Sequence, residues 1–320
     1  MKNGKVAVAT VLLCMGAPVI GQAQEFPTGD LRYLLHVEPG GATDVMARRL
    51  AEQLQNQLGV NVIVENRSGG SGARQMAQLA RADADGLTLG SVTASHLGMF
   101  EQSGQFTSDS VEWACNLVLE PYLLAVRTDS GIDSLADLVE TAKAAPGTIS
   151  VAGFGQASGG HVAWLMFNEA AGMEDGVVNW VPYDSVGDAV TATLGGHNNV
   201  AIGYIGLVKQ HVEAGTMKVI GIMSDARSEI MPDVPTYAEA GYTVDTRWQQ
   251  FRGIIVPQDT PIEAQEALCG AVETALKTPE LQKYITDSDL IEGFMPPAEF
   301  TEFVKAQEAA TKTWLARLGQ

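Results

Sequence analysis

Apolar and polar residues along positions 31–66 follow a strand–helix–strand pattern. Alternation with a period of two over residues 31–37 predicts a half-buried strand. Apolar side chains every four positions over residues 46–58 predict one buried helix face, and Gly59 stands where a helix-ending glycine is usual. The apolar run 60–64 predicts the next strand. The positions that carry this pattern are Leu31, Tyr33, Leu35 and Val37, then Met46, Leu50, Leu54 and Leu58. This order predicts a right-handed crossover in a parallel sheet.

The turn at residues 38–44 has the composition of an anion-binding site. It lies at the carboxyl end of a strand, where open α/β sheets bind ligands. Gly40 and Gly41 let the backbone approach a ligand closely. The free N–H groups and the positive dipole end of the following helix favour a carboxylate or a phosphate. The competing interpretation is a plain turn in which Thr43 or Asp44 caps the helix.

Two more turns rich in Gly, Ser and Thr follow in the first half of the chain. Residues 65–72 precede a helix, and residues 91–96 follow the short apolar strand 87–90. Because the carboxyl ends of parallel strands meet at one edge of a sheet, we expect all three turns to line the same rim.

The second half of the chain repeats this arrangement of strand, small-residue turn and helix. Strand 121–126 leads into a different region, and Asp133 or Ser134 is predicted to cap the next helix. Strand 149–152 then ends in the glycine-rich turn 153–161, which precedes another helix. Two such units that face each other would enclose a cleft.

The remaining elements are read from the same periodicities. Residues 251–257 predict a strand that returns the chain to the first unit. Thr236 and Glu239 form a capping box that predicts a helix start. The other expected elements are strands 200–204 and 218–223 and helices 186–194, 262–276, 279–286 and 297–318.

Residues 1–23 have the pattern of a cleaved secretory signal peptide, with two lysines, an apolar core and small residues at its end. The alternative, a lipoprotein signal at Cys14, is opposed by Leu13, because a small residue is expected there. No later stretch is long and apolar enough to cross a bilayer. We therefore expect a soluble, exported protein of about 300 residues, enough for two domains.

Charge excludes some partners. The chain has 38 acidic and 20 basic residues, a formal net charge of −18, so nucleic acid and anionic membrane surfaces are poor partners. A small anion is not excluded, because charges are screened over about 8 Å at physiological ionic strength. The local N–H groups therefore decide what a sheltered cleft binds.

The sequence shows no clear catalytic or metal-binding pattern. Ser158 and His161 lie close together, but the segment lacks the Gly-x-Ser-x-Gly turn of hydrolases, so we expect His161 to order the loop or pack at the helix start. Cys115 and Cys269 allow one disulfide whose geometry the sequence leaves open. Arg252 either meets a second ligand carboxylate or pairs with a structural Asp, and we favour the pairing. The other histidines, interpreted as core or surface residues without metal-ligand spacing, are His36, His96, His197 and His211.

An ordered set of motifs over nearly the whole mature chain resembles the extracytoplasmic binding receptors of tripartite tricarboxylate transporters, often called the Bug family. The matching segments are residues 39–44, 64–67, 85–89, 161, 181–183, 194–196, 232–236, 239–241, 252–257 and 260–261. The chain departs from the family pattern at His36 and Val37, where proline and an aromatic residue are common. Ala73 replaces a common asparagine, and Phe251 a common tryptophan.

The resemblance implies a two-domain α/β periplasmic binding fold, type II-like, with two crossover strands and a central ligand cleft. Domain 1 would comprise residues 24–124 and 252–320, and domain 2 residues 125–251. One ligand carboxylate would be held between two loops, residues 40–44 and 155–161, partly through ordered waters. The residues expected to contact the ligand are Gly40, Gly41, Ala42, Thr43, Asp44, Ser71, Gly72, Thr93, Ser95, Gln156, Ser158, Gly159, Gly160, His161, Asp184 and Tyr204, with Arg252 as a further candidate.

The resemblance also implies a function. The chain would be a periplasmic receptor, monomeric and without cofactor, metal or catalytic activity, that delivers a small organic acid to the permease subunits of a membrane transporter. One alternative is a carboxylate-sensing binder that presents its bound state to a signalling partner. Another is a secreted hydrolase that uses Ser158 and His161. The acid itself is left open among mono-, di- and tricarboxylates, acidic amino acids and aromatic acids.

Overall fold

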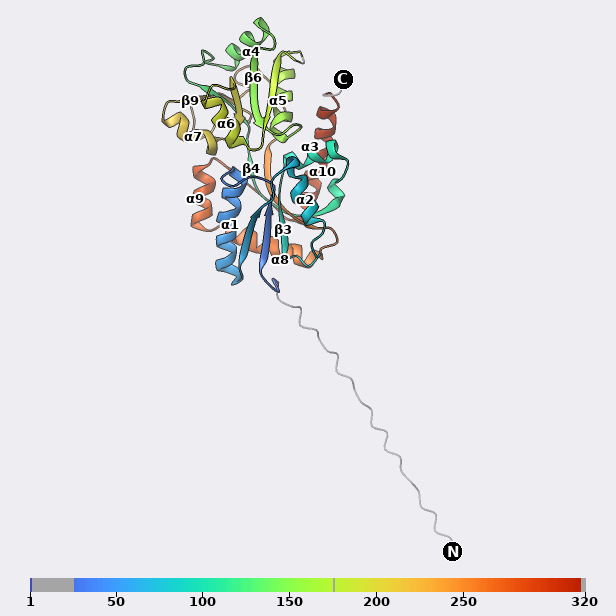
Figure 1. The fold of residues 1–320 in the computed structure, drawn as a ribbon. Helices are drawn as coiled ribbons and strands as arrows, with labels where there is room; N and C mark the ends of the chain where they lie inside the picture. The colour runs from blue at the N-terminus through green and yellow to red at the C-terminus, as the bar shows by residue number, and fades with distance from the viewer. Residues whose placement is uncertain (2–25, 175, 318–320) are drawn as a thin grey trace.

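Two β-sheets, each with helices on both faces, make up the computed structural model, which describes residues 1, 26–174 and 176–317 (Figure 1). We call the six-stranded sheet and its helices the first lobe, and the five-stranded sheet and its helices the second lobe. The two-lobed α/β architecture expected from the sequence is confirmed. The predicted signal peptide falls, apart from residue 1, outside the described residues.

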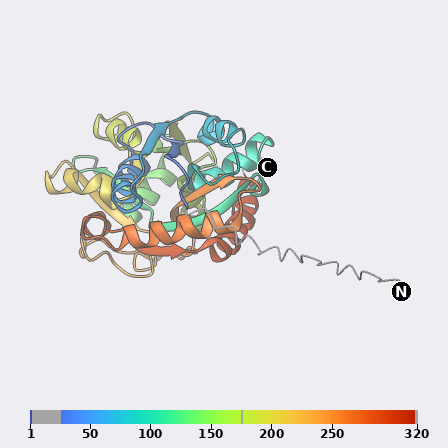
Figure 2. The same cartoon turned by 90° about the horizontal axis from the view of Figure 1, so that it is seen from below.

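The first lobe is built on a sheet with the strand order β11-β4-β10-β3-β1-β2. Its strands are β1 (Leu31–Leu35), β2 (Val62–Asn66), β3 (Thr88–Thr93), β4 (Val111–Glu120), β10 (Gln250–Pro257) and β11 (Ile291–Met295). One face carries α1 (Ala42–Leu58), α8 (Ile262–Leu276) and α9 (Pro279–Asp287). The other face carries α2 (Ala73–Leu79), α3 (Ala94–Ser103) and α10 (Pro297–Leu315). Figure 2, seen from below, shows α1 and α10 on opposite sides of this lobe. Two 3-10 turns are η1 (Gly70–Gly72) and η2 (Ser108–Ser110).

The second lobe has the strand order β7-β6-β8-β5-β9. Its strands are β5 (Leu123–Arg127), β6 (Ile149–Phe154), β7 (Val178–Tyr183), β8 (Val200–Gly203) and β9 (Met217–Ile222). The two helices that pack on one face of this sheet are α4 (Leu135–Ala144) and α5 (Gly159–Ala170). Those on the other face are α6 (Val186–Leu194) and α7 (Ile205–Glu213).

The chain passes between the lobes twice. It leaves the first lobe at the end of β4 and enters β5 after only Pro121 and Tyr122, and it returns through β10. Strand β10 runs antiparallel to both β3 and β4, and β5 runs antiparallel to both β8 and β9. The pairs β1–β2, β1–β3, β6–β7 and β6–β8 are parallel. The parallel strands therefore present their carboxyl ends, and the turns that follow them, to the space between the lobes.

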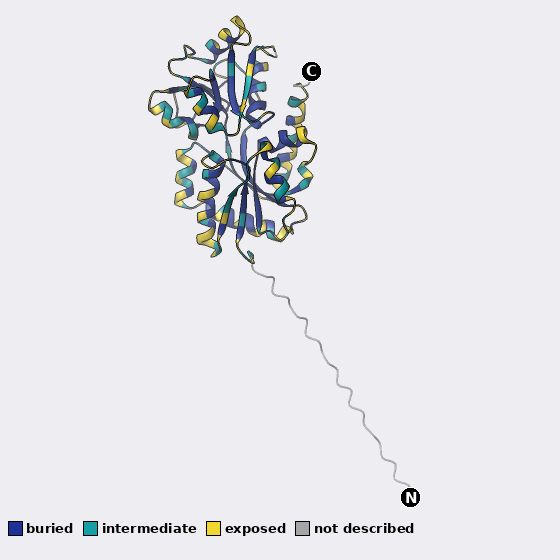
Figure 3. Cartoon of the chain, viewed as in Figure 1, coloured by how far each residue is buried: buried dark blue, intermediate teal, exposed yellow. Residues whose placement is uncertain are grey.

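Burial explains which elements the periodicity revealed. Both sheets are covered on both faces and are mostly dark blue in Figure 3, while exposed residues lie on the outer sides of the helices. Helices 186–194 and 262–276 have the predicted bounds. Strands β4 and β11 were not predicted, and β4 is buried on both faces, so its sequence shows no alternation of polar and apolar residues.

Two local predictions need correction. The capping box forms, because Thr236 N donates to Glu239 Oε2 and Glu239 N to Thr236 Oγ1, but the segment is a turn and not a helix. Helix α1 is capped by the backbone of Gly41, and not by Thr43 or Asp44.

The two cysteines do not form the disulfide that the sequence left open. Cys115 and Cys269 are both buried and free, and the Cys269 thiol donates to the carbonyl oxygen of Ala114 at 2.9 Å. Burial, together with the neighbouring Cys269, raises the pKa of the Cys115 thiol. The Cys115 thiol therefore remains protonated, and both cysteines act as small core residues.

Candidate functional site

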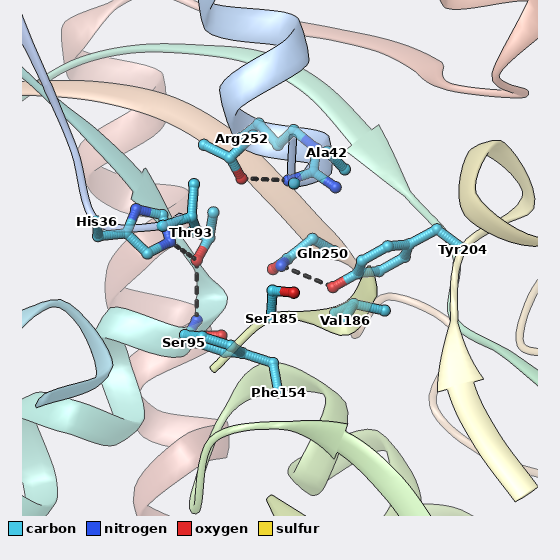
Figure 4. A pocket seen from close by; sticks show the side chains of 13 residues that line it. His36, Ala42, Thr93, Ser95, Phe154, Ser185, Val186, Tyr204, Gln250 and Arg252 are labelled. Carbon is cyan, nitrogen blue, oxygen red and sulfur yellow. Dashed lines mark hydrogen bonds between the residues drawn. The ribbon is translucent and has the colours of Figure 1, made fainter. Parts of the chain in front are cut away.

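A small cavity lies where the turns after β1, β3, β6, β7 and β8 meet (Figure 4). Its volume is about 30 Å³, room for about two water molecules. The first lobe contributes His36, Val37, Gly41, Ala42, Thr43, Thr93, Ser95, Gln250 and Arg252, and the second lobe contributes Phe154, Ser185, Val186 and Tyr204. Because both lobes supply its walls, this inner cavity is enclosed only when the lobes are together.

Two helix starts from opposite lobes meet at the inner cavity. No side chain caps α1, whose first residues Ala42 and Thr43 line the cavity, so its first-turn N–H groups are left for a ligand. Gly40 has φ +86°, a conformation that favours glycine. From the second lobe, Ser185 and Val186 at the start of α6 line the opposite wall. The sequence predicted that loop 155–161 faces α1, whereas the second-lobe helix start on this cavity is that of α6.

The Asp44 side chain does not line the inner cavity and does not cap helix α1. Its carboxylate accepts hydrogen bonds from Gly40 N at 2.9 Å and Asn66 Nδ2 at 2.9 Å, and it pairs with Arg48 at 2.9 Å. Burial alone would raise the pKa of Asp44, but the bonds from Arg48, Gly40 and Asn66 lower it. The carboxylate thus stays charged, holds the 38–44 turn in place, and is neutralised by Arg48.

A buried amide fixes the protonation of His96. Gln75 Nε2 donates to the carbonyl oxygens of Leu34 at 3.0 Å and Ser91 at 2.8 Å, so its Oε1 must face His96 Nε2, which lies 3.1 Å away. That ring nitrogen therefore carries the proton. The other ring nitrogen, Nδ1, accepts from Thr93 N at 3.3 Å. Burial lowers the pKa of His96 to about 4, so the ring is neutral at pH 7.

The same reasoning orients His36, which lines the cavity. Ser91 Oγ accepts from His36 N at 3.3 Å and lies 2.8 Å from His36 Nδ1. The hydroxyl proton of Ser91 has no other acceptor among the described residues, so Ser91 donates it to His36 Nδ1. His36 therefore carries its own ring proton on Nε2. Burial first, and then the neighbouring His96 and Arg252, lower the pKa of His36, so this ring is also neutral.

His36 in turn decides what Thr93 offers to the cavity. Thr93 Oγ1 accepts from Ser95 N at 3.4 Å and lies 3.4 Å from the protonated Nε2 of His36. With both lone pairs engaged, the Thr93 hydroxyl has only its proton left for a ligand. The backbone and side chains behind the cavity thus make Thr93 a hydrogen-bond donor.

Three more cavity hydroxyls already accept a hydrogen bond from the protein. Ser95 Oγ accepts from Gly159 N at 3.4 Å, across the two lobes. Tyr204 OH accepts from Gln250 Nε2 at 2.8 Å, and burial raises the pKa of Tyr204, which keeps the phenol protonated. Thr43 Oγ1 accepts from Arg252 Nη1 at 2.5 Å. The protons of these hydroxyls remain available, so the cavity is lined mainly by donors.

Arg252 pairs with a buried carboxylate, as expected, but the partner is Glu120 and not an Asp. Both side chains are buried, and the guanidinium also lies 5.2 Å from the centre of the Tyr204 ring. Burial raises the pKa of the Glu120 carboxyl, and the charge of Arg252 offsets only part of this rise. Burial alone would lower the pKa of Arg252, but the Glu120 carboxylate outweighs this effect, so the pKa of Arg252 is raised. The pair joins the crossing strands β4 and β10 beneath the cavity.

The start of α5 is engaged by the protein itself. Ser158 Oγ accepts from the backbone N of His161 at 3.1 Å, and the His161 ring Nδ1 accepts from Ala157 N at 3.0 Å. The ring stacks on Trp180 with centroids 4.4 Å apart, and burial lowers the pKa of His161 to about 4. His161 therefore orders the loop, as the sequence predicted, and its Nδ1 is not available to activate Ser158.

A second, outer cavity of about 190 Å³ adjoins the inner one. Its lining residues are His36, Glu38, Ser68, Gly69, Ser71, Arg74, Phe154, Gly155, Tyr183 and Asp184. His36 and Phe154 line both cavities, and their rings meet edge to face with centroids 6.4 Å apart. One ring from each lobe thus forms the boundary between the two spaces. Among the described residues, no three His, Cys, Asp or Glu side chains are grouped as metal ligands.

Comparison with known proteins identifies the family. The profile described as the tripartite tricarboxylate transporter family receptor matches residues 46–319. The chain belongs to this receptor family. BugT of Bordetella pertussis is 32% identical over 233 residues, which cover 71% of this chain and 70% of BugT. A UPF0065 protein of Agrobacterium vitis is 29% identical over 282 residues, 85% of this chain and 79% of that protein.

Solved structures share the fold of this receptor. Rpa4515 of Rhodopseudomonas palustris, solved with adipate, aligns with a TM-score of 0.83 at 23% identity and covers 92% of this chain and 99% of its own. MatC of the same organism, solved with malate, aligns with a TM-score of 0.80 at 22% identity, covering 90% and 99%. The receptor thus has the two-lobed fold of periplasmic binding proteins, and within the described residues none of its helices is long and apolar enough to span a bilayer.

The residues predicted to contact a ligand fall into three groups in the receptor. Those that line the inner cavity are Gly41, Ala42, Thr43, Thr93, Ser95, Tyr204 and Arg252. Those that line the outer cavity are Ser71 and Asp184. Those that line neither are Gly40, Asp44, Gly72, Gln156, Ser158, Gly159, Gly160 and His161. In the last group, Asp44, Ser158 and His161 make the turn hydrogen bonds described above, and Gly159 donates to Ser95.

Sequence reasoning missed several residues that line the cavities. His36 was read as a core or surface histidine, although it lies near the carboxyl end of the first predicted strand, at the sheet edge where ligands bind. Phe154 and Ser185 stand at the carboxyl ends of β6 and β7, so the same rule would have found them. Phe154 also supplies an aromatic wall from the lobe opposite His36 and Val37. Gln250 carried no local signal.

Proposed function

We propose that this chain is an extracytoplasmic receptor that binds a small organic acid by one carboxylate and delivers it to a membrane permease of the tripartite type. Family membership supports the receptor role. Two proteins of the same fold are described as bound to malate and to adipate, which supports an organic acid as ligand. The observation that carries the proposal is the donor character of the inner cavity.

A carboxylate is the ligand that this lining suits best. The hydroxyls of Thr43, Thr93, Ser95 and Tyr204 each already accept a hydrogen bond from the protein, so each is left with a proton to donate. An ionised carboxylate only accepts hydrogen bonds, whereas a sugar or an alcohol brings donors that would find few partners here. The uncapped start of α1 adds N–H groups and the positive end of its dipole.

The magnitudes are sufficient without an unpaired cation. Hydrogen bonds to a charged group contribute about 1.5–3 kcal/mol each, and a helix start up to about 2 kcal/mol in a sheltered site. Micromolar affinity requires roughly 8 kcal/mol after an association cost of at least about 4 kcal/mol. Five or six of the available donors provide this. Arg252 adds its field, although Glu120 neutralises most of its charge.

Ligand entry requires the lobes to part. The inner cavity holds about 30 Å³, far below the roughly 300 Å³ or more of usual small-molecule sites. Its walls come from both lobes, and the lobes are joined by β4–β5 and β10. We infer hinge closure around the acid, with the closed receptor as the form that the permease recognises. Catalysis is not part of this proposal, because the ring nitrogen Nδ1 of His161 is engaged by Ala157.

Thermal unfolding with matched ligands tests the binding step. At least one of the three acids glutarate, malate and adipate should stabilise the receptor by about 2.7 kcal/mol at a hundredfold excess over its dissociation constant. The uncharged analogues 1,5-pentanediol and glutaramide should have no effect. Stabilisation only by sugars, diols or cations would reject a carboxylate receptor. Delivery is tested by uptake of the labelled acid in cells with and without the gene.

A further inference from the structure

The side chain of Gln250 contacts both lobes at the inner cavity. Gln250 is the first residue of β10 and is 5% exposed. Its Oε1 accepts hydrogen bonds from the backbone N of Ala94 at 3.2 Å and from Tyr122 OH at 3.4 Å. Its Nε2 donates to Tyr204 OH at 2.8 Å (Figure 4). Because a backbone N–H can only donate, Ala94 fixes which end of the amide is the oxygen, and the amide nitrogen must face Tyr204.

The three partners of this amide come from three parts of the fold. Ala94 is the first residue of α3 in the first lobe. Tyr122 lies between β4 and β5, where the chain crosses to the second lobe, and Tyr204 directly precedes α7 in the second lobe. The bond to Ala94 therefore fixes the Gln250 side chain within the first lobe, whereas the bond to Tyr204 joins the two lobes.

The bond from Gln250 also decides what the Tyr204 hydroxyl offers to the cavity, which both side chains line. A phenol that accepts a hydrogen bond from an amide keeps its proton for another partner. Arg252 stands two positions along the same strand, on the same face, and donates to the hydroxyl of Thr43 in the first lobe. Strand β10 thus orients one cavity hydroxyl in each lobe.

We propose that Gln250 is a positioning residue that presents the Tyr204 hydroxyl to the ligand carboxylate as a donor, and that it does so only while the lobes are closed. This inference rests on the proposed carboxylate-binding function and adds a residue that couples recognition to closure. Gln250 stays bound to the first lobe through Ala94, so opening separates Tyr204 from the amide. A ligand that enters the open receptor gains the Tyr204 donor as the lobes close.

The substitution Gln250→Glu changes one end of the amide. Glutamate keeps the oxygen that Ala94 N and Tyr122 OH bind, and it replaces the NH2 group that faces Tyr204 with a second acceptor. The phenol then donates its proton to position 250 and not to the ligand. The probe is the one of glutarate, malate and adipate that stabilises the receptor most. Calorimetry should show that Gln250→Glu weakens its binding by at least about tenfold, as for one lost hydrogen bond to a charged group.

A double-mutant cycle separates the lost donor from the added charge. Tyr204→Phe removes the phenol and should by itself weaken the probe by roughly 10- to 150-fold. Combined with Tyr204→Phe, Gln250→Glu still adds its charge but has no proton to withdraw. Its further loss of affinity should then be at least about tenfold smaller than in the wild type. In stopped-flow measurements the loss should lie mainly in the dissociation rate, because Gln250 acts after closure, whereas a damaged fold would also slow association.

Two more variants complete the test. Gln249→Glu is the matched control, because it places the same charge one position away. Gln249 lines neither cavity, and its buried Oε1 has no hydrogen-bond partner among the described residues, so this variant should bind the probe nearly as the wild type does. Gln250→Met removes the amide without adding a charge, and it should also weaken binding.

The outcomes distinguish the two proposals. If none of the three acids binds, the carboxylate receptor is rejected, and the role of Gln250 with it. If the probe binds Gln250→Glu and Gln250→Met as tightly as the wild type, the receptor function stands and the positioning role is rejected. An equal loss from Gln250→Glu with and without the Tyr204 phenol also rejects it, because Gln250 then acts through another group. Melting curves of the unliganded variants verify that each is folded.

Discussion

Gly98 and Ala157 lie so close across the two lobes that a Cβ atom at Gly98 would be 1.8 Å from the carbonyl oxygen of Ala157. Gly98 is on α3 of the first lobe, and Ala157 is in the turn before α5 of the second lobe. The adjacent hydrogen bond from Gly159 N to Ser95 Oγ joins the same two elements. Because glycine has no Cβ atom, position 98 allows the two lobes to approach this closely.

Replacing Gly98 with alanine should hold the lobes apart. The added methyl cannot fit against backbone, so the closed form becomes strained while each lobe keeps its own fold. We expect a larger radius of gyration in small-angle scattering and at least about a tenfold loss of ligand affinity, because binding must now also overcome this strain. Gly270→Ala is the control, since a Cβ there meets nothing within 4 Å on helix α8. Equal affinity in the two variants would contradict the prediction.

The donor role of Thr93 predicts a difference between two small substitutions. Thr93→Val removes the hydroxyl and should weaken carboxylate binding by roughly 10- to 150-fold, as expected for a lost hydrogen bond of about 1.5–3 kcal/mol to a charged group. It also removes the cap of α3, at a stability cost of about 1 kcal/mol. Thr93→Ser keeps the oxygen and should bind nearly normally. Calorimetry of both variants checks this, and similar affinities would show that the hydroxyl does not meet the ligand.

The buried pair of Arg252 and Glu120 should respond strongly to single substitutions. Arg252→Met leaves the Glu120 carboxylate buried without its partner and should cost about 3–5 kcal/mol of unfolding free energy. Glu120→Gln leaves the guanidinium charge uncompensated and should also destabilise. The double variant with methionine at both positions should recover part of the loss. Urea denaturation of the single and double variants measures the coupling, and additive losses would show that the pair acts independently.

The buried histidines predict acid sensitivity of the fold. The pKa of His96 is about 4 in the folded chain, against about 6.5 when unfolded. Below pH 6.5 the unfolded state binds a proton that the folded state does not, so stability is fully present above pH 6.5 and falls as the pH drops toward 4. The loss is roughly 3 kcal/mol for His96, with a similar contribution from His161.

Urea denaturation between pH 7.5 and pH 4.5 measures this slope. His96→Gln should flatten it, even if the variant is less stable at pH 7.5, because one titrating group is gone. The exposed His197 offers the matched control His197→Gln, which should keep the wild-type slope. A wild-type stability that does not change over this pH range would contradict neutral, buried histidines.

Local sequence signals were sufficient for most of the fold. Helices such as α8 appeared at their predicted bounds because an amphipathic period and end signals act within one segment. The glycine turn at 38–44 was recognised because φ at Gly40 and the uncapped helix start are local properties. Strand β4 was missed because both of its faces are buried, which removes the alternation.

What the sequence determined by itself is therefore the set of strands, helices and glycine turns and the family to which their order belongs. What only the tertiary structure decided is which turns meet: α6 and not α5 faces the α1 start, and Arg252 pairs with a glutamate 132 positions away. The position of the His36 proton likewise depends on Ser91, and the donor role of Thr93 depends on His36, although both partners are distant from His36 in sequence. Hydrogen-bond direction and charge pairing act through space, so no local pattern encodes them.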